Sequence, residues 1–349
     1  MRFTVAGACS VRAVIDLRSD TLTKPTPAML AAMASAEVGD EQFHEDPTVN
    51  ELQRRMAELL GHEAAVFLPT ATMANQVALR AQTRPGSVIL AEERTHILIY
   101  EWGGPAIHSG LVMHGVPAEK GRPTPEQILA DEDLGAGGAV VLENTHRSSG
   151  GRVWPLEEFA AAAAAARARG AAVHLDGARL FNASVAAGIP PADWARLADS
   201  VTICFSKGLG CPLGAILAGS EQVIERAWEG KYLFGGAMRQ SGVLAAAALY
   251  ALDHHVDRLA DDHARARRLV EGLADAGVPV DLDAVETNFV SIAETEGALE
   301  RLREQGVLLS DLRTGYLRAV THLEVGDEDV ERAIEGIPAA LGVERRVNA

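Results

Sequence analysis

The stretch Ser200 to Leu217, SVTICFSKGLGCPLGAIL, decides how this chain is organised. Its first part, residues 201–205, is apolar and rich in β-branched side chains, which predicts a buried strand. Lys207 follows the strand at its carboxyl end, where an α/β sheet places the groups that face a ligand crevice. An amine that is buried near other cations loses its proton more easily, so Lys207 is a candidate nucleophile for Schiff-base chemistry. The alternative is a lysine that ends the strand and extends into water.

Composition limits the class of protein. A chain of 349 residues can form one large core and a smaller domain, because single cores stop growing at roughly 250–300 residues. Apolar residues make up 48% and charged residues 23%, and no apolar run approaches the roughly 18 residues that span a bilayer, so we expect no membrane partner. The formal net charge of −16 argues against nucleic-acid binding. The three cysteines, Cys9, Cys204 and Cys211, lack metal-ligand spacing, and we expect a cytoplasmic protein without disulfides or a metal site.

Strands and helices alternate along most of the chain. We expect an N-terminal extension and arm over residues 1–26, a large domain over 27–255 and a small C-terminal α/β domain over 256–349. The predicted strands of the large domain are 65–68, 87–90, 110–114, 139–142, 171–175 and 201–205. The helical stretches between several of them predict a large, mostly parallel sheet wrapped by helices. A helix rich in small residues, 235–252, is predicted to pack between lobes or subunits.

Two further stretches complete a site around Lys207. HLDGAR places Asp176 at the end of a predicted strand, where a carboxylate faces the crevice or, alternatively, caps a helix. In TATMANQ, Thr70 and Thr72 stand at a helix N-terminus, which is either a phosphate cup or an ordinary threonine cap. Pyridoxal 5'-phosphate (PLP) needs a lysine for the imine, a carboxylate for the pyridine nitrogen and an anion cup. Lys207, Asp176 and residues 70–75 supply all three.

The motifs together resemble those of a known family. In chain order they are IDLRSDT, VGDEQFHEDPT, TATMANQ, ENTH, SGGRVWPL, HLDGARLFNA, CFSKGL, GAMRQSG and RAVTH. From about residue 14 to the C-terminus the chain resembles the low-specificity L-threonine aldolases, which are PLP-dependent enzymes of fold type I with an aspartate-aminotransferase-like fold. The resemblance implies that the large domain holds a mostly parallel, seven-stranded sheet. The resemblance implies a carbon–carbon lyase that reversibly splits L-threonine, L-allo-threonine and related β-hydroxy-α-amino acids into glycine and an aldehyde. It also implies a homotetramer, a dimer of dimers with active sites at the dimer interface.

The resemblance implies a role for each matching residue. Lys207 looks like the residue that binds PLP covalently, Asp176 like the partner of the pyridine nitrogen, and His96 like the ring-stacking histidine. Further cofactor contacts are implied at Ala71, Thr72, Arg179, Ser206 and Arg239, and substrate contacts at Ser19, His146, Arg179 and Arg318. Three acceptors fit the β-hydroxyl proton: His96, His146, or a water molecule held by one of them.

Some positions differ from the usual family pattern. Ala71 and Ala74 replace glycines of the phosphate turn, and an alanine there is costly only where φ is positive. Phe43 stands where tyrosine is common, and Arg147 follows His146 where asparagine is common. These differences bear on substrate preference more than on reaction type. The alternatives are another fold type I enzyme, such as a β-eliminating lyase or an aminotransferase, and a non-catalytic scaffold of the same fold.

Overall fold

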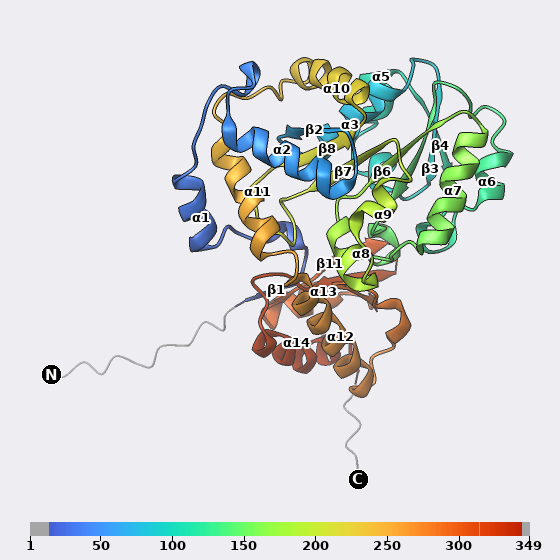
Figure 1. Cartoon of the computed structure of the whole chain (residues 1–349). Helices are drawn as coiled ribbons and strands as arrows, with labels where there is room; N and C mark the ends of the chain where they lie inside the picture. The colour runs from blue at the N-terminus through green and yellow to red at the C-terminus, as the bar shows by residue number, and fades with distance from the viewer. Residues whose placement is uncertain (1–13, 314, 344–349) are drawn as a thin grey trace, which may run out of the picture.

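The computed structural model describes residues 14–313 and 315–343, so the first 13 residues of the predicted extension and arm, 1–26, lie outside the described residues. The described chain folds into a large domain and a small one (Figure 1), each with its own apolar core. Ile15 and Leu17 of the N-terminal arm belong to the core of the small domain. None of the helices in the described part of the chain combines the length and apolar character that a bilayer-spanning helix needs.

A seven-stranded sheet forms the centre of the large domain, with strand order β2-β8-β7-β6-β5-β3-β4. Its strands are β2 (Ala64–Leu68), β3 (Val88–Glu92), β4 (Val112–Val116), β5 (Ala139–Glu143), β6 (Ala172–Asp176), β7 (Ser200–Cys204) and β8 (Ala215–Gly219). Only β8 runs antiparallel to its neighbours β2 and β7, and the other pairs are parallel. The predicted large, mostly parallel sheet is therefore confirmed.

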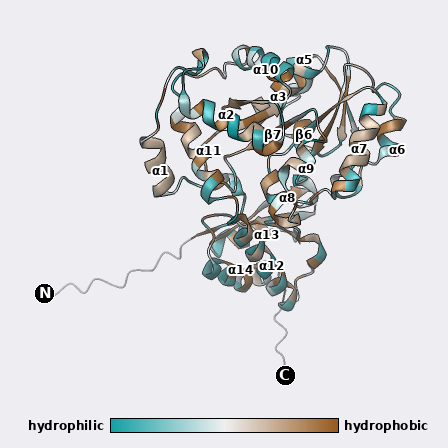
Figure 2. Ribbon diagram, in the orientation of Figure 1, coloured by the Kyte–Doolittle hydropathy of each residue, from teal (hydrophilic) through white to brown (hydrophobic). Residues whose placement is uncertain are grey.

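Helices cover both faces of this sheet because its strands alternate their side chains. In β2, Val66 and Leu68 pack with helix α3, whereas Phe67 packs in the core cluster on the other face. The strands are correspondingly hydrophobic along most of their length (Figure 2). The helices of the large domain are α1 (Pro27–Ala34), α2 (Pro47–Leu60), α3 (Ala71–Gln82), α4 (His96–Ile99), α5 (Gly104–Ser109), α6 (Pro125–Ala130), α7 (Leu156–Ala168), α8 (Leu180–Ala187), α9 (Pro191–Ala195), α10 (Glu221–Leu233) and α11 (Gly242–His254).

Three details differ from the sequence-based prediction. Strand β4 begins two residues later than predicted, because Gly110 adopts φ +67° and ends α5. Strand β8 had no predicted range, because the glycine- and proline-containing loop before it gives no clear signal for where the strand begins. The predicted helix 235–252 begins only at Gly242 in α11. Asp46 accepts the backbone N–H of Gly242 at 2.8 Å, and Glu41 accepts that of Met238 at 3.3 Å. These hydrogen bonds hold residues 235–241 as a loop before the helix.

The small domain packs helices against short sheets. Its strands are β1 (Ile15–Asp16), β9 (Phe289–Ala293), β10 (Val307–Leu308), β11 (Ser310–Arg313) and β12 (Tyr316–Val320), and its helices are α12 (Leu259–Asp275), α13 (Ala298–Glu304) and α14 (Asp327–Ala340). β12 lies between β9 and β11 in an antiparallel sheet, while β1 pairs in parallel with β10. This pairing ties the N-terminal arm to the small domain.

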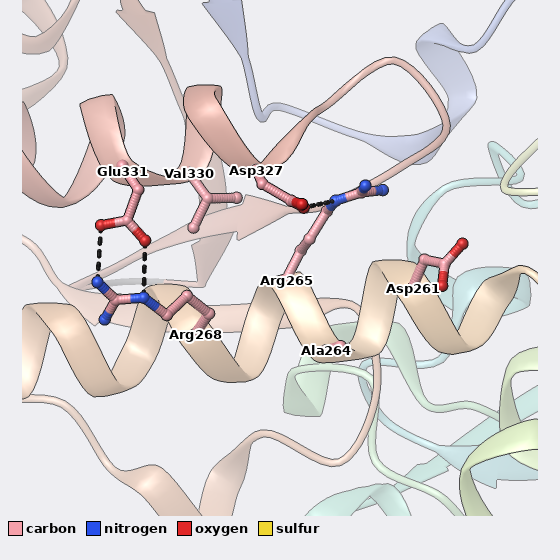
Figure 3. A pocket seen from close by; sticks show the side chains of 7 residues that line it. All are labelled: Asp261, Ala264, Arg265, Arg268, Asp327, Val330 and Glu331. Atoms are coloured by element: carbon pink, nitrogen blue, oxygen red, sulfur yellow. Dashed lines mark hydrogen bonds and ion pairs between the residues drawn. The ribbon is translucent and has the colours of Figure 1, made fainter.

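A surface cleft of about 460 Å³ lies between α12 and α14 (Figure 3). Arg265 pairs with Asp327 at 2.7 Å, and Arg268 with Glu331 at 2.6 Å. These arginines already have carboxylate partners, and the cleft is separate from the residues predicted to bind the cofactor.

Candidate active site

The parallel strands bring Asp176 and Lys207 to one edge of the sheet. Asp176 is the last residue of β6 and lies opposite Thr202 in β7, and Lys207 follows β7 by three residues. The backbone carbonyl of Lys207 accepts the hydroxyl of Thr23 at 2.7 Å and the N–H of Gly210 at 2.9 Å. Gly210 has φ +78°, which lets the chain turn sharply after the lysine. The lysine thus stands on a turn that is fastened to the N-terminal arm.

Asp176 is buried, and its two oxygens have different partners. Asn75 of α3 donates its side-chain N–H to Oδ2 at 2.9 Å, and the backbone N–H of Ala178 donates to Oδ1 at 3.1 Å. A carboxylate has about four acceptor positions, so these two bonds leave capacity for at least one more donor. That capacity is what the protonated pyridine nitrogen of PLP requires.

His96 begins α4 and lies in an acidic environment. Its Nδ1 is 2.9 Å from Oε1 of the buried Glu101, and its backbone N–H donates to Glu143 at 2.6 Å. Burial by itself would lower the pKa of His96, but the hydrogen bond that its Nδ1 makes to Glu101 and the charges of Asp176, Glu101 and Glu143 raise it above its ordinary value. With Nδ1 engaged by Glu101, Nε2 is the nitrogen left for a ligand.

The N-terminus of α3 forms the predicted phosphate cup. Thr70 caps the helix by accepting the backbone N–H of Met73 at 3.1 Å. The N–H groups of Ala71 and Thr72 belong to the first turn, where a helix offers no internal acceptor. Ala71 and Ala74 are not among the described residues with positive φ, so the two alanines fit the helix without strain. Ser206, the remaining predicted member, lies beside Lys207 with its Oγ 3.5 Å from Cys204 Sγ.

A cavity of about 560 Å³ opens at this cup. It is lined by Thr70, Thr72, Met73, Gln76, Ile107, His108, Leu233 and Phe234. Ile107 and Leu233 are exposed apolar side chains, and Trp102, between α4 and α5, is 92% exposed. The cup therefore borders an apolar surface that no other part of the described chain covers.

The two arginines predicted to hold the substrate carboxylate differ in their contacts. Arg179 makes an ion pair with the buried Asp20 through two hydrogen bonds, at 2.7 Å and 2.5 Å. Burial alone would raise the pKa of Asp20, but the positive charge of Arg179 holds it well below its ordinary value. Arg318 is 7% exposed and donates from Nε to Ser310 at 2.7 Å, but its buried Nη1 has no partner among the described residues. Desolvation, together with the charges of Arg147 and Arg179, lowers the pKa of Arg318 to about 10.

Ser19 lies one residue before Asp20 and is nearly buried. Its hydroxyl oxygen accepts the backbone N–H of Thr21 at 3.2 Å and is 2.8 Å from the hydroxyl of Thr21. Ser19 is therefore held in the same arm that supplies the partner of Arg179.

Two predicted residues have their side-chain partners outside this group. His146 is fully buried, with Nδ1 2.8 Å from the Ser149 hydroxyl and Nε2 2.9 Å from Glu92. Burial lowers the pKa of His146, but the charge of Glu143 and the hydrogen bond to Glu92 outweigh burial and raise it. Arg239 extends from the surface loop before α11, where its side chain is 62% exposed and pairs with Asp40 at 3.0 Å.

The structure also adds residues that the motifs did not single out for a role. Asp20 holds Arg179, Asn75 holds Asp176, and Glu101 holds His96. Asp20 and Asn75 stand inside the IDLRSDT and TATMANQ motifs, which was the available signal. Glu101 had none, since one acidic residue in a short loop is common in any soluble protein.

Three features of this site fit PLP: the spare acceptor capacity of Asp176, the N-terminus of α3, and Lys207 at the same edge of the sheet as Asp176. This is the arrangement of PLP-dependent enzymes of fold type I. The model of the protein family described as "Beta-eliminating lyase" matches residues 16–295 of this chain. A low-specificity L-threonine aldolase of Escherichia coli (strain K12) is 41% identical over 325 residues, 91% of this chain and 96% of the relative. Low-specificity L-threonine aldolase 1 of Arabidopsis thaliana is 39% identical over 344 residues, 94% of this chain and 96% of the relative. The chain therefore belongs to the family of the low-specificity L-threonine aldolases, which confirms the family that its motifs resemble.

Solved structures agree on the fold. A threonine aldolase of Leishmania major superposes with a TM-score of 0.81 at 21% identity, covering 94% of this chain and 99% of the other. A serine palmitoyltransferase of Sphingomonas wittichii gives a TM-score of 0.74 at 20% identity, covering 94% of this chain and 87% of the other. The predicted fold type I architecture is confirmed.

Proposed function

We propose that this chain cleaves L-threonine, L-allo-threonine and related β-hydroxy-α-amino acids to glycine and an aldehyde, with PLP bound at Lys207. The observation that carries the proposal is the buried guanidinium of Arg318, whose Nη1 is unpaired while the neighbouring Arg179 is already paired. A buried cation without a partner favours an anionic ligand. The carboxylate of an amino-acid substrate supplies that anion, and a planar guanidinium can bind both of its oxygens.

Each residue then has a defined task. When bound, PLP supplies the electron sink for the electron pair left at the substrate Cα once the Cα–Cβ bond breaks. Lys207 holds the cofactor, and Asp176 holds a proton at its ring nitrogen. Ala71, Thr72 and Ser206 bind its phosphate. Arg318 fixes the substrate carboxylate and thereby orients the Cα–Cβ bond.

We propose His96 as the acceptor of the β-hydroxyl proton. Its Nδ1 is engaged by Glu101, which leaves Nε2 available, and its side chain is 32% exposed. His146, the other candidate, is enclosed, and both of its ring nitrogens lie against Ser149 and Glu92. A general base must reach the proton that it removes, and of these two histidines His96 is the one with an accessible ring nitrogen.

The products test this function. Purified protein incubated with L-threonine or L-allo-threonine should release glycine and acetaldehyde in equal amounts, without ammonia or a keto acid. A β-elimination, the reaction in the name of the matching family, would instead release ammonia and a keto acid. Those products would contradict the proposed aldol cleavage. Lys207→Ala should lose both turnover and the visible absorption band that borohydride bleaches in the wild type.

We also propose that the enzyme is a homotetramer built from dimers, with the active site at the dimer interface. The exposed side chains of Ile107 and Leu233 line the cavity at the phosphate cup, and Trp102 is also exposed. Exposed apolar side chains of this kind favour a protein partner. A second copy of the chain would cover it and could bring Arg239 of one protomer to the cup of the other. Light scattering should report a multiple of the 36.9 kDa chain mass. An active monomer at assay concentration would exclude the assembly.

A cytoplasmic location is proposed from the cysteines. Cys204 and Cys211 are buried free thiols, which fits a reducing compartment. Fractionation of the source cells with an antibody against the chain tests this location, and recovery outside the cytoplasm would exclude it.

A further inference from the structure

We propose that Asn75 and Glu101 act as one positioning unit, which couples the carboxylate intended for the ring nitrogen of PLP to the histidine that takes the substrate proton. The inference rests on the proposed function for its roles but on hydrogen bonds for its geometry. Asn75 donates to Asp176 Oδ2 at 2.9 Å and to Glu101 Oε1 at 3.0 Å, and the same Glu101 oxygen lies 2.9 Å from His96 Nδ1. One amide group therefore joins both halves of the site.

The orientation of Asn75 follows from its neighbours. Carboxylate oxygens facing Asn75 act as acceptors, so its NH₂ group must face Asp176 and Glu101. Its carbonyl oxygen then faces Nε2 of His174 at 3.0 Å, and that nitrogen must carry the hydrogen. Burial lowers the pKa of His174 to about 4, so this ring is neutral and its Nδ1 accepts a hydrogen bond.

The far end of this network is equally determined. Nδ1 of His174 lies 2.7 Å from the Ser200 hydroxyl, which therefore donates to it. The Ser200 oxygen in turn accepts the side-chain N–H of Gln82 at 2.6 Å. The chain of hydrogen bonds thus runs in one direction from α3 through β7 and β6 back to α3, and it allows Asn75 a single orientation.

The amide also separates two acidic groups. One ligand atom each of His96, Glu101 and Asp176 lies within 4.8 Å of the other two. Like charges this close repel, and the NH₂ group of Asn75 offers each carboxylate one N–H. Gln76 adds a further donor to Glu101 at 2.5 Å. Without Asn75, Asp176 would keep only the Ala178 N–H and would be free to turn away from the ring nitrogen.

Glu101 itself acts through His96. It holds Nδ1, which fixes the ring plane and directs Nε2 toward the substrate. The groups that face His96 are Glu101, Asp176, Glu143 and the ring of Tyr100, whose centroid is 5.5 Å away. Among the described residues, Glu101 is the one carboxylate that accepts a hydrogen bond from the imidazole ring of His96. Glu143 accepts the backbone N–H of His96 instead. Glu101 touches neither cofactor nor substrate and is a positioning residue.

Two variants of unchanged size test the unit. Glu101→Gln should reduce kcat/KM on L-threonine by about 10- to 100-fold, because it removes a charged hydrogen-bond partner. It should also move the acidic limb of the pH profile to lower pH, since a charge that raises the pKa of His96 is lost and the base then stays unprotonated to lower pH. Asn75→Asp removes both N–H donors and should weaken PLP binding by at least about 10-fold, measured by absorption titration.

A readout without cofactor separates this proposal from the proposed function. In cofactor-free protein labelled with ¹⁵N-histidine, the imidazole titration of His96 should shift to lower pH in Glu101→Gln. Asn182→Asp changes another buried asparagine, one that contacts His263 at 3.2 Å, and should leave PLP affinity and the His96 titration unchanged. Melting curves verify that each variant is folded.

Two results would overturn the unit. One is an unshifted His96 titration in Glu101→Gln, and the other is a PLP affinity in Asn75→Asp equal to that of Asn182→Asp. If the wild type released no aldehyde while both shifts appeared, the proposed reaction would fail and the positioning unit would stand.

Discussion

Arg318 offers the sharpest test of how the substrate is held. The guanidinium is 7% exposed, is anchored through Nε to Ser310 at 2.7 Å, and keeps Nη1 buried and unpaired. If the substrate carboxylate is its partner, Arg318→Ala removes one side of a buried charge pair, which costs about 2–5 kcal/mol. That range corresponds to a loss of about 30-fold to several thousand-fold in kcat/KM. Arg318→Lys should fall between alanine and wild type, because an ammonium lacks the planar fork.

Stability should respond in the opposite way. In the free enzyme Arg318 bears the desolvation and the repulsion from Arg147 and Arg179 that lower its pKa to about 10. Arg318→Met fills a similar volume without a charge and should melt no lower than wild type in the absence of substrate.

A matched arginine in the same small domain serves as the control. Arg268, on α12, pairs with Glu331 at the surface with 49% of its side chain exposed (Figure 3). Arg268→Ala should leave kcat/KM unchanged, since surface pairs contribute about 0–1 kcal/mol to stability. The assay is steady-state aldehyde release from L-threonine at saturating PLP. A change below about fivefold for Arg318→Ala would remove Arg318 from the site.

Two other expectations concern buried charges. Asp176→Asn keeps the shape but cannot hold a proton on the ring nitrogen, so kcat should fall by about 100-fold or more; an unchanged circular dichroism spectrum would show that folding is retained, and an unimpaired variant would exclude the role. Lys231 is fully buried and paired with Glu41, so Lys231→Met leaves an unpaired buried carboxylate at a cost of about 3–5 kcal/mol. Its melting temperature should drop, and adding Glu41→Leu should restore part of it; an equal or larger drop in the double variant would contradict this.

The parts of the site that follow from local sequence are those at strand ends. A short apolar run predicts each buried strand, and the residue after it must appear at the carboxyl edge of the sheet, which places Asp176 and Lys207 together. The helix N-terminus at residues 70–75 is equally local, because a threonine before a helical pattern predicts its start. These are properties of a few consecutive residues and need no knowledge of the tertiary structure.

The partners of these residues are non-local, and for that reason the sequence pattern could not assign them. Asn75 reaches Asp176 across 101 positions and Asp20 reaches Arg179 across 159. A carboxylate or amide in a turn has the same sequence signature whether it caps a helix or orients a catalytic group. The start of α11 was misplaced for the same reason, since its first N–H is held by Asp46 from a distant loop.

The motifs imply that Arg179 and Arg318 both bind the substrate carboxylate, but the two arginines differ in whether they already have a partner. Turning Arg179 toward a substrate would leave Asp20 buried without its partner, which costs about 3–5 kcal/mol. Asp20 is also 3.3 Å from the side-chain N–H of Asn288, which precedes β9 in the small domain. The pair therefore joins the N-terminal arm, the large domain and the small domain at one point. We infer that Arg179 fixes the distance between the domains. Arg318, whose Nη1 has no partner among the described residues, then supplies the positive charge that pairs with the substrate carboxylate.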